Sequence, residues 1–164
     1  MQVGRLADRL DVPYRDIRYL LEQGILPKGI AEKPGRGEHR DFTPAQAFWI
    51  GLVLKLKQCG IRAPAAKEIA NFAKRSVFKA AKESEWDSGF NPFAGELVTD
   101  KKWYLDIGDM LFTRFATNAN PDVEGIFENF WCIVTDGRKE KAPGASPVVI
   151  IRIDLTQLAS LLIE

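Results

Sequence analysis

The apolar positions in the first part of the chain recur at helical spacing. Between Val3 and Leu10 they follow the i, i+3, i+4, i+7 pattern of a short amphipathic helix. A second helix is predicted over residues 13–23, because proline fits the first helical turn and Gly24 suits the end of a helix. Two short helices joined by a tight turn are typical of a helix-turn-helix unit.

Residues 28–42 break this helical pattern and are rich in Gly, Lys and Arg. The segment predicts a short extended hairpin, or wing. Ile30 and Phe42 are the apolar residues expected to anchor its two legs. A basic hairpin beside two short helices predicts a winged form of the helix-turn-helix unit.

Two longer helices are predicted next. Thr43 and Pro44 supply an N-cap and a first helical residue, and residues 59–60 end this third helix. The fourth helix is expected from Ala63 to about Lys82, with apolar residues along one side and lysines away from it.

From residue 97 onward the pattern changes to short aromatic and β-branched runs between turn signals. Strands are predicted at WYLDI, MLFTRF, NFWCIV and VVIIRI, with the polar loop DGRKEKAPGAS between the last two. DLTQLASLLIE predicts a closing helix, capped by Asp154 or Thr156. The predicted class is α+β: an N-terminal all-α winged helix-turn-helix domain, then a small antiparallel β-sheet domain with a C-terminal helix.

Charge divides the chain in the same place. The net charge of the whole chain is +1, but residues 1–82 hold 16 Lys and Arg against 8 Asp and Glu, and residues 83–164 hold 7 against 14. This asymmetry favours a basic half that meets a polyanion. The alternative is a contact between the two halves themselves. We expect a winged helix-turn-helix domain that binds a polyanion over 1–82, a linker over 83–96, and a β-rich dimerisation or signal-input domain over 97–164.

Three segments in order carry a family resemblance: VGRLADRLDVPYRDIRYLLEQGIL, then HRDFTPAQ, then LKLKQCGIRAPAAKEI. Over about residues 3–75 the chain resembles the winged helix-turn-helix of MerR-family transcription regulators. The resemblance implies sequence-specific binding to double-stranded DNA, with the helix over 13–23 in the major groove and the wing over 28–42 on phosphates. It extends to the winged modules of phage excisionases and terminase small subunits, which act in DNA architecture or packaging.

The resemblance also assigns roles. Arg18 matches the recognition-helix arginine, Tyr19 the tyrosine after it, and Arg40 the wing arginine, whereas His39 replaces the first wing tyrosine. Arg15 faces outward on the same helix, where an arginine can reach a base edge or a phosphate. The residues predicted to bind DNA are Tyr14, Arg15, Arg18, Tyr19, Lys28, Lys33, Arg36, His39 and Arg40.

One departure from the family concerns dimerisation. Family regulators pair through a long C-terminal helix, but here the helical pattern breaks near Ser84 and an acidic β-rich segment follows. A homodimer is still expected, and the edge of VVIIRI is a candidate for strand-to-strand pairing. The dense aromatic residues of the second half fit a core, a dimer surface or a ligand pocket. A protein-interaction adaptor that uses the basic half is a further alternative.

Catalytic and metal chemistry have little support. His39 is the only histidine, which disfavours a His-based zinc site or a carboxylate–His–Ser triad. A magnesium site built from Asp106 and its acidic neighbours competes with their expected role in turns. No enzyme activity, metal or cofactor is predicted, and a small-molecule effector has no support in the sequence. Cys59 and Cys132 suggest no disulfide framework and no apolar run reaches about 20 residues, so the expected location is the cytoplasm.

Overall fold

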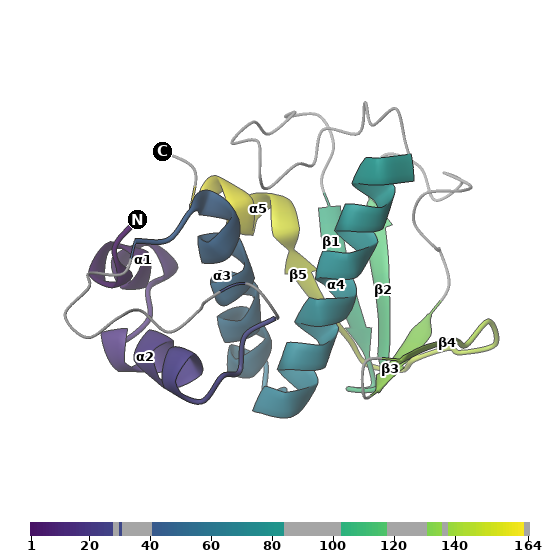
Figure 1. Cartoon of the computed structure of the whole chain (residues 1–164). Coiled ribbons are helices and arrows are strands. Elements are labelled where there is room, and N and C mark those ends of the chain that lie inside the picture. Colours follow the sequence, from purple (N-terminus) through teal and green to yellow (C-terminus); the bar gives the residue numbers. More distant parts are fainter. Residues whose placement is uncertain (28–29, 31–40, 84–102, 118–130, 136–137, 163–164) are drawn as a thin grey trace.

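The structure, a computed structural model, describes residues 1–27, 30, 41–83, 103–117, 131–135 and 138–162. Helices α1 to α4 come first along the chain, and a five-stranded antiparallel sheet and helix α5 follow (Figure 1). This order confirms the predicted α+β class.

The four N-terminal helices are α1 (Val3–Leu10), α2 (Tyr14–Glu22), α3 (Pro44–Gln58) and α4 (Ala63–Glu83). Helix α3 begins with a capping box, in which Thr43 Oγ1 accepts from Gln46 N at 3.2 Å and Gln46 Oε1 accepts from Thr43 N at 3.0 Å. Pro44 follows at the first helical position, and Cys59 caps the other end. The predicted start and end of this helix are therefore confirmed.

The strands are β1 (Trp103–Gly108), β2 (Phe112–Thr117), β3 (Cys132–Thr135), β4 (Arg138–Lys141) and β5 (Ile150–Asp154), in the order β4-β3-β2-β1-β5. Helix α5 (Leu155–Ser160) follows β5 without a loop. Asp154 Oδ1 accepts from Gln157 N at 2.8 Å, so the N-cap of α5 is Asp154 and not the other candidate, Thr156.

Strand β4 corrects the prediction of a polar loop between the last two strands. Its sequence, Arg-Lys-Glu-Lys, has no apolar residue and low strand propensity. The strand forms because it pairs with β3, with Ile133 opposite Glu140 and Val134 opposite Lys139. Tertiary pairing overrides local propensity here, and charged residues at a sheet edge discourage pairing with another chain.

The opposite edge of the sheet is apolar where β5 begins. Val148, Val149 and Ile150 are 92%, 62% and 46% exposed. Asp109, in the tight turn between β1 and β2, holds the start of this segment, because its carboxylate accepts from Val148 N at 3.2 Å and from Val149 N at 2.9 Å. The predicted VVIIRI strand therefore does lie at an edge.

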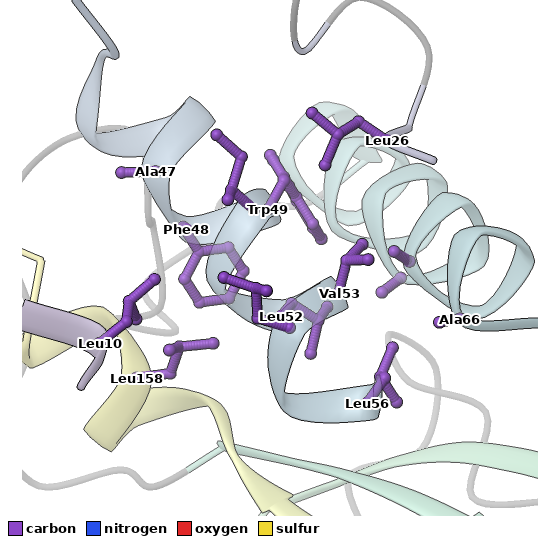
Figure 2. Packing of buried hydrophobic residues seen from close by; sticks show 14 of the residues in the cluster. Leu10, Leu26, Ala47, Phe48, Trp49, Leu52, Val53, Leu56, Ala66 and Leu158 are labelled. Atoms are coloured by element: carbon purple, nitrogen blue, oxygen red, sulfur yellow. The ribbon is translucent and has the colours of Figure 1, made fainter. Parts of the chain in front are cut away.

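One hydrophobic cluster joins the helices to the sheet. Helix α3 is its centre, and Figure 2 shows Leu10 of α1 and Leu158 of α5 beside Phe48. The helices approach closely at Gly51, where an added Cβ would lie 3.1 Å from both Leu10 Cδ2 and Leu158 Cδ1. The halves that the charge pattern separates thus pack together, and most of the predicted linker, residues 83–96, lies outside the described residues.

Helix α4 lies across the sheet (Figure 1). Its buried apolar residues within the described side chains are Ala66, Ile69, Ala70, Phe72 and Ala73. Over residues 66–73 this face of α4 therefore packs inside the chain. In the part of the chain that the structure describes, no helix is both long and apolar enough to cross a lipid bilayer.

Candidate nucleic-acid interface

Helix α2 has a buried side and an exposed side. Ile17 and Leu20 are fully buried and hold the helix against the core, and Figure 1 shows α2 on the outer side of the helical layer. Pro13 precedes the helix with φ −59°, so the chain enters its first turn without losing a backbone donor. The packing therefore fixes which residues face away from the molecule.

Four of the residues predicted to bind DNA share the exposed side. The side chains of Arg15 and Arg18 are 87% and 60% exposed, and Tyr14 and Tyr19 are 51% and 47% exposed. The spacing of these four positions places them on one face of a helix. We refer to these residues as the α2 face; it combines two cations with two half-exposed aromatic rings.

Arg18 is held along the helix by Glu22. Its Nη2 donates to Glu22 Oε1 at 2.8 Å and its Nε donates to the same oxygen at 3.2 Å. This hydrogen bond and the nearby negative charge raise the pKa of Arg18 above its ordinary value. The contact orients the guanidinium, but a phosphate would have to compete with Glu22 for it. Arg15 is less restrained, since its Nε lies 3.8 Å from Asp16 Oδ1.

A lysine from α3 extends the α2 face. Lys57 Nζ lies 4.6 Å from the centre of the Tyr19 ring, which is the geometry of a cation–π contact. Lys57 is not among the residues that the sequence predicted to bind DNA. Lys55 and Lys57 form a basic last turn of α3, but only the folded structure brings that turn next to α2.

The turn after α2 is fixed to α4. Gly24 has φ +63°, a left-handed conformation that favours glycine, and Ile25 N donates to Leu20 O at 3.1 Å across it. Lys67 Nζ donates to Gly24 O at 2.9 Å. The predicted helix end at Gly24 is therefore confirmed, and α4 sets the position of this end of α2.

The structure describes only the base of the wing. Ile30 and Phe42 are 4% and 3% exposed, so both predicted anchors are buried. Phe42 N donates to Met1 O at 2.8 Å, and the backbones of Asp41 and Gln2 form an isolated antiparallel β-bridge. The five predicted wing contacts lie outside the described residues: Lys28, Lys33, Arg36, His39 and Arg40.

Of the acidic residues considered as a magnesium site (Asp106, Asp109, Asp122 and Glu124), the two that the structure describes have other partners. Asp106 is bound by arginines, and Asp109 accepts backbone N–H groups. Asp122 and Glu124 lie outside the described residues. Across the described ranges, no group of three or more His, Cys, Asp or Glu residues could hold a metal ion.

The comparisons with known proteins bear on the same part of the chain. Residues 1–72 match the family model described as MerR HTH family regulatory protein. No curated protein and no solved structure matches the chain. The matched segment contains α1, α2, α3 and the first part of α4, including the whole α2 face. Residues 1–72 of this chain are therefore similar to the helix-turn-helix domain of MerR-family regulators.

Proposed function

We propose that the protein is a transcription regulator that binds double-stranded DNA in a sequence-specific way. One observation carries the proposal: the α2 face presents Arg15, Arg18, Tyr14 and Tyr19 to solvent from a helix held rigidly by its buried side. An α-helix fits the major groove of B-DNA, where arginine can donate to guanine O6 and N7. Arg15, the most exposed and least restrained, reads bases, and Arg18 contacts a phosphate.

The wing over 28–42 contributes phosphate contacts from Lys28, Lys33, Arg36, His39 and Arg40, and Lys57 adds a cation from α3. The protein acts in the cytoplasm and is a regulator rather than an enzyme. The sheet and α5 supply dimerisation or signal input. The basic half gives affinity, and the α2 face gives choice of sequence.

The test is selection of bound sequences from random duplex DNA at about 50 and about 150 mM salt, beside the variant Arg18→Ala. An enriched motif that the protein binds with lower affinity after Arg18→Ala supports the proposal. The control variant Lys141→Ala removes a charge from the β4 edge instead and should leave the motif and affinity unchanged. Absence of binding at low salt would exclude DNA and favour the adaptor, whereas assembly along DNA without a motif would favour an architectural or packaging factor.

Arg15→Ala and Arg18→Ala should have different effects on DNA binding. Arg15→Ala should reduce discrimination at one base pair by about 1–3 kcal/mol, because a lost base contact weakens only the sites that present it. Arg18→Ala should weaken binding to all sequences alike and make the salt slope shallower by about 1. Binding isotherms for the selected site and its single-base variants measure both effects. Equal loss of discrimination in the two variants would contradict these roles.

Removing the carboxylate of Glu22, which competes with a DNA phosphate for Arg18, should strengthen DNA binding. Glu22→Gln should raise affinity for DNA of any sequence. Arg18 would then no longer have to give up its ion pair with Glu22 in order to bind a phosphate. The slope of affinity against salt should stay the same, because the number of phosphate contacts does not change. The matched control is Glu22→Gln in the Arg18→Ala background. A gain of equal size there would mean that Glu22 acts only as a general negative charge.

We propose that the dimer forms through the β5 edge, since this edge is apolar at its start while the β4 edge is charged. Val148→Lys, at a side chain that is 92% exposed, should yield a monomer without loss of folding stability. Light scattering after size-exclusion chromatography measures the mass of each variant. A palindromic motif in the selection would accompany the dimer. An unchanged mass for Val148→Lys would move the interface elsewhere.

A further inference from the structure

The sheet has one face against the helices and one face turned away from them. Leu105, Ile107 and Ile153 belong to the core cluster with the helices. Because side chains alternate along a strand, Asp106 and Arg152 lie on the opposite face. This outer face therefore carries charged residues in the middle of the sheet. In the sequence the same residues are far apart and do not form a recognisable motif.

The charged residues form one cluster around Asp106. Asp106 is paired in register with Arg114 of β2 and Arg152 of β5 and is fully buried. Arg114 Nε donates to Asp106 Oδ2 at 3.0 Å. Arg152 donates twice, from Nε to Oδ1 at 2.7 Å and from Nη2 to Oδ2 at 2.9 Å. One carboxylate thus orients two guanidiniums, and we call these three residues the arginine cluster.

Aromatic rings flank the arginine cluster on both sides. Arg114 Cζ lies 4.3 Å from the centre of the Trp131 ring, and Arg152 Cζ lies 4.8 Å from the centre of the Tyr104 ring. Trp131 is 6% exposed, so Arg114 rests on a buried ring. Stacked guanidiniums lose little conformational freedom when they bind a further group, which is a requirement of a preorganised site.

The arginine cluster has more positive charge and more donors than Asp106 satisfies. Two guanidiniums face a single carboxylate, and within the described residues neither arginine has an ion pair with a second acid. A guanidinium has five N–H donors. Arg114 gives only Nε to Asp106, and in the part of the chain that the structure describes its terminal amino groups have no hydrogen-bond acceptor. The Arg114 side chain is only 29% exposed, so water reaches this charge incompletely.

We propose that the arginine cluster binds a small oxyanion, the carboxylate or phosphate group of a metabolite-sized ligand. Arg114 and Arg152 donate to it from their terminal amino groups, and Asp106 holds both guanidiniums in place from below. Planar guanidinium forks match carboxylate and phosphate oxygens in this way. Only the meaning of such a ligand as a regulatory signal rests on the proposed function, because the binding chemistry does not involve DNA.

The test follows the arginine Nε–H resonances of the full chain by NMR while inorganic phosphate, and separately malonate, replaces chloride at constant ionic strength. We expect saturable shifts at Arg114 and Arg152. The stronger of the two anions identifies phosphate or carboxylate as the preferred group. Arg114→Lys keeps the charge but loses the fork, and should weaken the shift at Arg152. Arg15→Lys is the matched control in the α2 face and should change nothing at the cluster.

No saturable shift at Arg114 and Arg152 in the unaltered protein would overturn the proposal, and this titration needs no variant to fold. Equal shifts with chloride, or shifts confined to Arg15 and Arg18, would overturn it as well. Duplex DNA that shifts Arg114 and Arg152 in parallel with Arg15 would replace the small ligand with nucleic acid. If the protein does not bind DNA but phosphate saturates the arginine cluster, the proposed function is wrong and the proposed oxyanion site is supported.

Discussion

Replacing Asp106 with asparagine should lower the free energy of unfolding by about 3–5 kcal/mol, the typical cost of breaking a buried ion pair from one side. Asp106 is fully buried and accepts from both Arg114 and Arg152. Asparagine has nearly the same shape but no negative charge, so two neighbouring guanidiniums would share one face of the sheet without a counter-ion. Urea unfolding followed by circular dichroism measures the loss.

The control removes every charge of the arginine cluster at once. Asp106→Leu combined with Arg114→Met and Arg152→Met should recover most of the stability, because no desolvated charge is left without a partner. The same triple variant should no longer bind an oxyanion. A loss within about 0.5 kcal/mol for Asp106→Asn alone, the range of ordinary surface substitutions, would contradict the account of a buried, strongly paired carboxylate.

The second large effect is expected at the contact between α5 and the N-terminal helices. Leu158→Ala should cost about 2–5 kcal/mol, since the leucine is 3% exposed and its removal leaves a cavity beside Gly51 and Leu10. Because one hydrophobic cluster joins the helices and the sheet, both should unfold in a single shifted transition. Urea unfolding followed by circular dichroism in the far UV and the near UV measures the shift of the midpoint. Coincident transitions at the two wavelengths show that the helices and the sheet unfold together.

Leu161→Ala is the matched control for this prediction. Leu161 caps the same helix but is 43% exposed, so its replacement should change stability by no more than about 0.5 kcal/mol. If the two alanine variants were equally stable, α5 would not be part of the common core. Two separate transitions in Leu158→Ala would show instead that the halves are independent folding units.

Local signals made much of the fold predictable. The Thr43–Pro44 helix start, the stop at Gly24 and the cap at Asp154 each depend on a few neighbouring residues, and the structure has all three. The α2 face was predictable for a related reason. Helical spacing alone turns Arg15 and Arg18 away from the side that carries Ile17 and Leu20. The ordered family motifs added the expectation that this face meets DNA.

Features that depend on register were not predictable. Strand β4 looks like a loop until its pairing with β3 is known. Arg114 and Arg152 are 8 and 46 residues away from Asp106 along the chain, and only the pairing of three strands brings them together. The contact of Lys57 with Tyr19 likewise depends on how α3 crosses α2. A single sequence does not contain the register that would have revealed these contacts.

The position of α5 has a consequence for synthesis on the ribosome. Arg9 Nη1 donates to Leu161 O at 3.3 Å across a sequence separation of 152, and Leu158 fills the same side of the helical core. The helix-turn-helix segment leaves the ribosome first, yet the side of Leu10 and Gly51 that Leu158 covers stays open to water until α5 emerges. A nascent chain stalled before α5 would therefore expose apolar surface, which favours chaperone binding and aggregation. Production of the folded protein is thereby linked to completion of its sheet and of α5.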